Sequence, residues 1–246
     1  MSPVRRHSAG SRSVPSSAEV TGVLLCGGKS RRMGVDKTEL VLDGRRLVDR
    51  GVATLKRVAS DVLLASGESA RFPELGCRCV LDARADLGPL AGLAAGLAAA
   101  RTRWVAVLAS DMPHAGPELF EALLARAQRD GLDGAVLQTS AGAEPLCAVY
   151  STACVDAIGD ALARGERRMN SFWNGNDGLR RLQVLAFDAA ELGLAVDVER
   201  QVVNLNTPAD LARERARVHE EGLSRDRART RATRSIENAQ HGLRSA

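Results

Sequence analysis

Short apolar runs alternate with longer segments of helical spacing along most of this chain of 246 residues. Runs of strand length lie at 20–26, 61–65 and 104–108, and segments whose apolar residues recur every three or four positions separate them. This alternation is typical of βαβ units, which form a mostly parallel, twisted sheet with helices on both faces. We therefore predict a single Rossmann-like α/β domain over residues 20–222.

The same pattern predicts the individual elements. Strands are expected over residues 20–26, 61–65, 79–81, 104–108, 134–138, 146–150, 184–187 and 202–204. Helices are expected over residues 46–58, 89–100, 117–128, 151–164 and 208–218. Because ligands of parallel sheets bind beyond the carboxyl ends of the strands, Gly27, Asp82 and Asp111 should lie on one edge of the sheet.

The net charge of +4 comes from the two ends of the chain. Residues 1–19 hold three arginines against one glutamate, and residues 223–246 hold six arginines against one aspartate and one glutamate. The part between them is therefore slightly acidic, which argues against nucleic acid as a partner. Neither end has the apolar residues needed for a core, so we expect disordered tails over 1–19 and 223–246.

No stretch of the sequence is apolar for long enough to cross a bilayer, and no secretory signal is present. The five cysteines include no C-x-x-C pair, and an odd number without a signal peptide favours reduced thiols. We expect a cytoplasmic protein without a membrane partner. Structural roles are expected for the cysteines, with Cys26 reachable by solvent.

A glycine pair, Gly27 and Gly28, ends the first apolar run and opens a strongly basic segment. Residues 24–37 read LLCGGKSRRMGVDK and contain Lys29 and Lys37, two of the three lysines of the chain. Glycine lets backbone N–H groups approach an anion closely, and Arg and Lys side chains complement phosphate oxygens. The segment matches neither G-x-x-x-x-G-K-[ST] nor G-x-G-x-x-G. It predicts a phosphate-binding loop of another kind, and the alternative is a glycine turn with a solvated basic face.

The pattern G-G-x-S-x-R-M-G-x-D-K resembles the signature of nucleotidyltransferases, and most closely that of the molybdenum cofactor guanylyltransferases. Further blocks follow in the order of that family: LD at 81–82, LGPLAGL at 87–93, LASDMP at 108–113, EPL at 144–146 with Tyr150, GERR at 165–168 and VNLNTP at 203–208. The resemblance covers about residues 20 to 218. It implies a Mg²⁺-dependent enzyme that transfers GMP from GTP to the terminal phosphate of molybdopterin and releases pyrophosphate.

The resemblance also implies roles for three charged residues. Arg32 should offset the charge of the leaving pyrophosphate and Lys37 the charge near the α-phosphate, while Asp111 should bind Mg²⁺. The alternative for Asp111 is an N-cap of the next helix. Asp36 is expected to orient Lys37 through an ion pair. Contacts with the nucleotide are expected from Leu25, Cys26, Gly27, Gly28, Lys37, Ser66, Asp82, Gly88 and Asp111.

The pterin substrate is expected to contact residues of the second half of the chain, namely Glu144, Arg167, Arg168, Asn204 and Asn206. Related nucleotidyltransferases use an asparagine near position 206 to complete the Mg²⁺ site, so Asn206 is also a candidate metal ligand. The adjacent arginines could instead complement the carboxyl end of the preceding helix. Ser66 lies where the family commonly has an asparagine, so one expected nucleotide contact differs.

Two other functions stay open. A sister enzyme could use CTP on molybdopterin or another nucleotide on a sugar phosphate, and a catalytically silent homologue could bind nucleotide or carry cofactor. The glycine pair and the block at 88–92 favour the guanylyl branch, and the basic and acidic residues at 32, 37 and 111 argue against a silent homologue. Besides GTP and molybdopterin, the family implies molybdenum-insertion proteins and apo-molybdoenzymes as partners.

Overall fold

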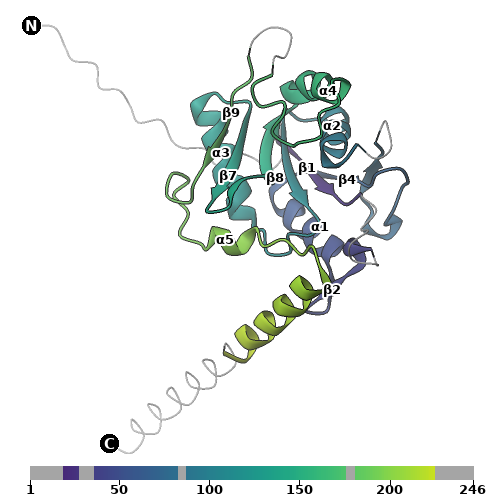
Figure 1. The fold of residues 1–246 in the computed structure, drawn as a ribbon, viewed down its shortest axis with the longest axis vertical. Helices are drawn as coiled ribbons and strands as arrows, with labels where there is room; N and C mark the ends of the chain where they lie inside the picture. The colour runs from purple at the N-terminus through teal and green to yellow at the C-terminus, as the bar shows by residue number, and fades with distance from the viewer. Residues whose placement is uncertain (1–18, 28–35, 83–86, 176–180, 225–246) are drawn as a thin grey trace, which may run out of the picture.

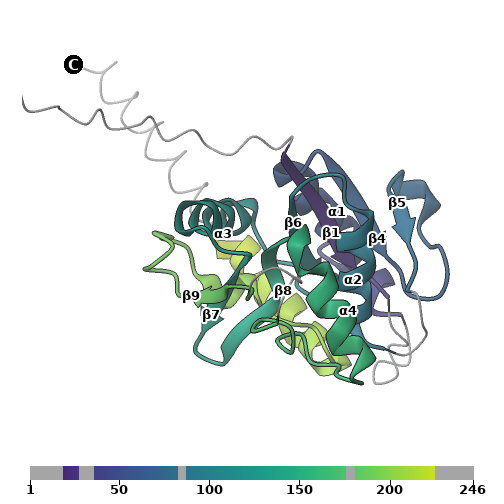
Figure 2. The ribbon, with the colours of Figure 1, turned by 90° about the horizontal axis from the view of Figure 1, so that it is seen from above.

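The computed structural model describes residues 19–27, 36–82, 87–175 and 181–224. They form a seven-stranded sheet covered by helices on both faces (Figures 1 and 2). The sheet order is β5-β4-β1-β6-β8-β7-β9. The strands are β1 (Val20–Leu25), β4 (Asp61–Ala65), β5 (Arg78–Val80), β6 (Trp104–Ala109), β7 (Gly134–Thr139), β8 (Gly142–Ser151) and β9 (Val184–Phe187). Only β8 pairs antiparallel to its neighbours in this sheet, so the mostly parallel α/β fold is confirmed.

Two pairs of helices enclose the sheet. On one face lie α1 (Leu47–Val58) and α3 (Pro117–Asp130), and on the other lie α2 (Pro89–Ala99) and α4 (Val155–Ala163), which contact each other. Successive residues of β1 alternate between the two cores, because side chains of a strand point to opposite faces: Leu24 joins the first core, and Val23 and Leu25 the second. The central strand is therefore buried on both faces, as its unbroken apolar run predicts.

The reversed strand β8 changes what lies on the carboxyl edge of the sheet. In its pairing with β6, Cys147 lies opposite Leu108, near the end of β6. The first residues of β8 therefore lie beyond the carboxyl end of β6, and Glu144 is among them. The strand begins at Gly142, four residues before the predicted start at 146.

Other elements differ from the expectations. The strand predicted at 202–204 is wrong: these residues form no strand, and a short helix α5 (Val198–Gln201) precedes them. The helix predicted over 151–164 starts with a 3-10 turn (Thr152–Cys154) before α4. A two-stranded ribbon, β2 (Val41–Leu42) and β3 (Arg45–Arg46), was not predicted. Its turn, Asp43-Gly44, has positive φ at both residues and is a known hairpin signal.

The last described element is a helix over residues 208–224, longer than the predicted 208–218. Thr207 and Asp210 cap its start reciprocally: Asp210 N donates to Thr207 Oγ1, and Thr207 N donates to Asp210 Oδ2. The helix projects from the domain beside the β2–β3 ribbon (Figure 1). Residues 223 and 224 therefore lie in this helix and not in the predicted tail. No helix within the described ranges has the length and apolar character to span a membrane.

Candidate active site

Three predicted site residues meet at the carboxyl edge of the sheet. The ammonium group of Lys37 lies 2.7 Å from Asn206 Oδ1 and 3.3 Å from Asp111 Oδ2. These residues come from three segments that are far apart in the sequence. Only Asp111 follows a strand of the sheet, β6; Lys37 lies in a 3-10 turn and Asn206 in an irregular segment, and tertiary contacts bring both to this edge.

Asp111 is held firmly just beyond β6. Ser110 N donates to Leu25 O at 3.1 Å, and Asp111 O accepts from Leu205 N at 3.0 Å. The second bond ties the irregular 203–206 segment to the end of β6 and so brings Asn206 beside Lys37. The N-cap alternative for Asp111 is wrong, because the next helix is α3, which begins at Pro117 with Gly116 at its N-cap.

The carboxyl group of Asp111 is in an unfavourable environment for its charge. Burial raises its pKa, and Lys37 offsets only part of that effect. Among the described residues, the buried Oδ1 atom has no hydrogen-bond partner. Burial also raises the pKa of Glu144, and the negative charge of Asp111 raises it further. Two acidic groups therefore share this edge, a typical arrangement where a cation or a cationic side chain has to be held.

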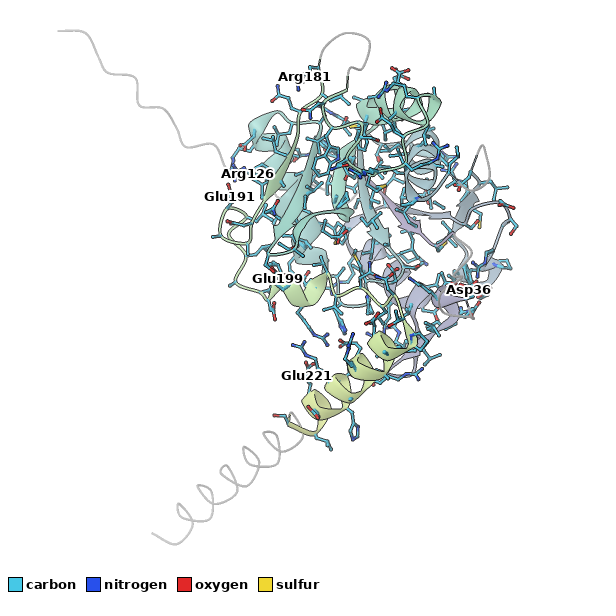
Figure 3. The ribbon with its side chains drawn as sticks, viewed as in Figure 1. Asp36, Arg126, Arg181, Glu191, Glu199 and Glu221 are labelled. Carbon is cyan, nitrogen blue, oxygen red and sulfur yellow. The ribbon has the colours of Figure 1, made fainter. Side chains whose placement is uncertain are left out.

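Lys37 begins a 3-10 turn (Lys37–Glu39) whose N-cap is Asp36. Asp36 Oδ1 accepts from Thr38 N at 3.0 Å, and Asp36 Oδ2 accepts from Arg71 Nη2. The prediction that Asp36 pairs with Lys37 is therefore wrong: Asp36 forms an ion pair with Arg71, and Lys37 forms one with Asp111. Figure 3 shows Asp36 near the start of the C-terminal helix. The sequence contains no motif around Arg71 that would have singled it out.

A second group of predicted residues follows β1, β4 and β5 on the same edge. A Cβ atom on Gly27 would lie 2.7 Å from Gly67 N, so the loops after β1 and β4 approach each other closely enough to require glycine. Asp82 N donates to Gly67 O at 2.9 Å, and Ser66 Oγ donates to Ser69 O at 2.7 Å. The buried Asp82 Oδ1 has no partner among the described residues, and burial raises the pKa of this carboxyl group.

Helix α2 begins beside Asp82. Gly88 precedes its first residue with φ of 76°, and a Cβ atom on Gly92 would lie 3.7 Å from Asp82 Oδ1. The small residues at this helix start therefore pack close to a buried carboxylate oxygen that has no partner among the described residues. This arrangement fits a nucleotide contact, for which Asp82 and Gly88 remain predictions.

The side chains of Cys26 and Leu25 are buried. Cys26 is 1% exposed and Leu25 is 9% exposed, and Cys26 Sγ points to Ala65 O. Burial raises the pKa of the Cys26 thiol to about 12. The expectation that Cys26 is reachable by solvent is therefore wrong, and any contact from these residues to a nucleotide would come from backbone atoms.

The pterin-side candidates Arg167, Arg168 and Asn204 lie in different surroundings. Arg167 and Arg168 are exposed, and their described hydrogen bonds stay within residues 166–171. Asn204 Oδ1 is buried without a partner among the described residues. Gly28 and Arg32 lie outside the described residues.

A metal ion would find few protein ligands here. Over the described ranges, no three His, Cys, Asp or Glu side chains cluster as a metal site. One carboxylate with a free oxygen and one amide oxygen are nevertheless a normal protein share of a Mg²⁺ site, because Mg²⁺ usually takes one or two carboxylates together with substrate phosphates and water.

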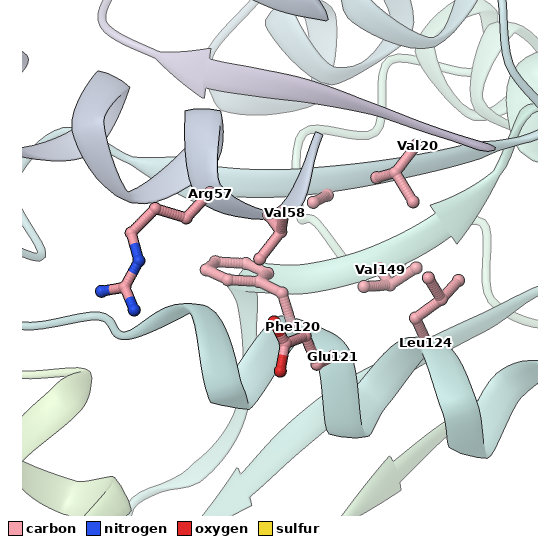
Figure 4. A pocket seen from close by; sticks show the side chains of 8 residues that line it. Val20, Arg57, Val58, Phe120, Glu121, Leu124 and Val149 are labelled. Carbon is pink, nitrogen blue, oxygen red and sulfur yellow. The ribbon is translucent and has the colours of Figure 1, made fainter. Parts of the chain in front are cut away.

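An apolar cavity elsewhere in the domain does not belong to this edge. It lies between α1 and α3 and is lined by Val20, Arg57, Val58, Ala106, Phe120, Glu121, Leu124 and Val149 (Figure 4). Val20 is the first residue of β1 and pairs with Trp104, the first residue of β6. The cavity is therefore near the opposite edge from Asp111.

Most of the α/β domain resembles known proteins. The model of the MobA-like NTP transferase domain matches residues 22–179. A protein of Pelotomaculum thermopropionicum named probable molybdenum cofactor guanylyltransferase is 34% identical over 197 residues, covering 80% of this chain and 92% of that protein. A protein of Opitutus terrae with the same name is 38% identical over 200 residues, covering 80% and 95%.

A solved structure has the same fold as this chain. Molybdopterin-guanine dinucleotide biosynthesis protein A from Archaeoglobus fulgidus superposes with a TM-score of 0.65 at 25% identity, over 81% of this chain and 99% of that one. The family match over residues 22–179 includes both Lys37 and Asp111. This chain therefore belongs to the MobA-like NTP transferase family.

Proposed function

We propose that this protein transfers GMP from GTP to the terminal phosphate of molybdopterin and releases pyrophosphate. The observation that carries the proposal is the cluster of Lys37, Asp111 and Asn206 at the carboxyl edge of the sheet. The names of its relatives, molybdenum cofactor guanylyltransferases, support the choice of substrates.

Mg²⁺ fits the residues present. Asp111 would hold it through the buried Oδ1 oxygen that has no other partner among the described residues, and Asn206 would add an amide oxygen. Bound there, Mg²⁺ would neutralise part of the triphosphate charge. The raised pKa of Asp111 is consistent with this role, because a buried carboxylate gains most from a nearby cation.

Different residues of the chain are assigned to the GTP phosphates, to the rest of the nucleotide and to the pterin. Lys37 stabilises negative charge that builds on the phosphates during transfer, a task for which preorganised cations need no covalent chemistry. Arg32 is assigned to the leaving pyrophosphate. Gly27 and Asp82 belong to the nucleotide side of the edge. On the pterin side we assign Glu144, Asn204, Arg167 and Arg168.

We place the reaction in the cytoplasm, with apo-molybdoenzymes and molybdenum-insertion proteins as later partners. No disulfide bond joins the five cysteines, all of which lie within the described residues, and this supports a reducing compartment.

The test is pyrophosphate release by the purified protein with GTP, ATP, CTP or UTP, each with and without molybdopterin. We expect release only with GTP, molybdopterin and Mg²⁺ together, and the Asp111→Asn variant serves as the matched inactive control. Release with CTP in place of GTP would make the protein a cytidylyltransferase. No release with any nucleotide would favour the silent homologue, and either result would refute the proposal.

A further inference from the structure

Arg71 joins two parts of the site that are separated in the sequence. Its guanidinium donates from Nη2 to Asp36 Oδ2 and, at 3.1 Å, to Thr38 Oγ1, while Nη1 donates to Cys26 O at 3.4 Å. Cys26 follows the last residue of β1, and Asp36 immediately precedes Lys37. One side chain therefore connects the end of the central strand to the turn that carries Lys37.

The connection continues through Asp36 to the backbone of Lys37. Asp36 caps the 3-10 turn (Lys37–Glu39) by accepting from Thr38 N with Oδ1, while its other oxygen accepts from Arg71. A three-residue turn has little intrinsic stability, because it fixes backbone angles for very few hydrogen bonds. The orientation of this turn, and with it the direction of the Lys37 side chain, therefore depends on the contacts of Asp36.

Two further neighbours, Cys79 and Phe72, contact Arg71. Its carbonyl oxygen accepts from Cys79 Sγ of β5 at 3.1 Å, and its guanidinium lies 4.5 Å from the ring centre of Phe72. Phe72 is 5% exposed and has φ of 57°, a left-handed conformation that is rare for a bulky residue. Such a conformation costs on the order of 1 kcal/mol and persists only where surrounding contacts enforce it.

We propose that Arg71 is a positioning residue for the transfer reaction: it fixes Asp36 against the end of β1 and thereby sets the position of Lys37. This inference rests on the proposed function. Arg71 does not need to touch either substrate, and its effect reaches the reaction through the ammonium group of Lys37. Because a displacement of about 1 Å can lower a rate by up to about 10²-fold, we expect a measurable effect on kcat.

The first test is a double-mutant cycle with Arg71→Met and Lys37→Met. Arg71→Met should lower kcat about tenfold in the wild-type background and change KM for GTP by less than about threefold, since positioning affects the transition state more than binding. In the Lys37→Met background the same change should lower kcat by less than about twofold, because the group that Arg71 positions is already absent. An equal loss in both backgrounds, or no loss in the wild type, would overturn the proposal.

Arg78→Met is the matched control. Arg78 lies on β5, donates to Ala99 O at 3.0 Å and forms an ion pair with Asp61 at 3.5 Å. The Arg78→Met substitution therefore removes comparable contacts at a place away from Lys37. Its kcat should stay at the wild-type value. If Arg71→Met does not fold, Arg71→Lys takes its place in the cycle, because lysine keeps the charge but lacks the planar fork that serves three acceptors.

A second readout does not need turnover. The chain has three lysines, and Lys56 is exposed on α1, so acetylation by acetic anhydride can be followed at Lys37 with Lys56 as internal reference. Arg71→Met should raise the rate at Lys37 about threefold or more, because an amine released from its ion pair is more exposed and reacts faster. An unchanged ratio would overturn the positioning role. If wild-type protein shows no transfer, the proposed function fails, and this ratio alone decides the role of Arg71.

Discussion

Replacing Asp111 by asparagine should abolish turnover and, at the same time, make the fold more stable. The carboxylate is buried, its Oδ1 has no partner among the described residues, and its side chain is only 18% exposed. Its attraction to Lys37 at 3.3 Å amounts to about 5 kcal/mol at an effective dielectric constant of 20. Removing a carboxylate from water costs several kcal/mol, so the two contributions are close in size.

The direction in which the pKa of Asp111 is shifted shows which of these two contributions is larger. Because the pKa of Asp111 is raised above its ordinary value of 3.8, the cost of burial exceeds the attraction to Lys37. The ionised group therefore lowers the stability of the native state at neutral pH. Asparagine has the same shape without the charge, and Lys37 keeps its 2.7 Å contact with Asn206. We expect the free energy of unfolding to rise by about 1 kcal/mol, which for a domain of this size is a melting temperature higher by about 2–4 °C.

The pH dependence gives the sharper test. A raised native pKa means that the native state binds protons more tightly than the unfolded state, so wild-type stability relative to the variant recovers as pH falls through that pKa. The difference should be largest above the raised pKa and vanish below about pH 3.8. It can be measured by urea unfolding of both proteins across this range.

Asp130→Asn is the matched control for this experiment. A hydrogen bond from Arg126 lowers the pKa of Asp130, at the far end of α3, so the same substitution there should not stabilise the protein and should leave turnover unchanged. A less stable Asp111→Asn protein, or one that retains near wild-type turnover, would refute the reasoning.

Three further outcomes are expected. Lys37→Met should lower turnover by about 10²-fold or more in the pyrophosphate assay, because it removes a preorganised cation; a loss below about threefold would contradict its role. GTP with Mg²⁺ should raise the melting temperature more than ATP, CTP or UTP at equal concentration, and a larger rise with CTP would point to the cytidylyl alternative. Cys26 should resist iodoacetamide at pH 8 until the protein unfolds, because its thiol is 1% exposed with a pKa of about 12; peptide mapping that finds rapid labelling would contradict this.

Local patterns were enough to predict most of the architecture. The apolar runs and helical spacings of the sequence predicted β4 and β9 at their observed bounds, and they predicted β1, α1, β5, α2, β6, α3 and β7 within about two residues. They also placed Gly27, Asp82 and Asp111 on one edge, because residues that follow parallel strands share it. These features depend on short-range periodicity, which a single sequence contains directly.

The 202–204 segment shows where such patterns fail. Its apolar residues suggested a strand, but the described structure has an irregular segment there, bonded to Asp111 through Leu205 N. That bond, together with the cap at Thr207 and Asp210, is what brings Asn206 next to Lys37. No local signal distinguishes a strand from an extended segment whose hydrogen bonds go to a loop.

The sequence by itself determined the order of elements, the edge on which the polar residues gather and the identity of the candidate catalytic groups. Only the tertiary structure decided the reversed direction of β8, which brings Glu144 to that edge, and the partners of the charged side chains. Asp36 is adjacent to Lys37 in the sequence yet pairs with Arg71, while Lys37 pairs with Asp111. Ion pairs form between groups that folding brings within a few ångströms, and that distance depends on the packing of the whole sheet rather than on separation along the chain.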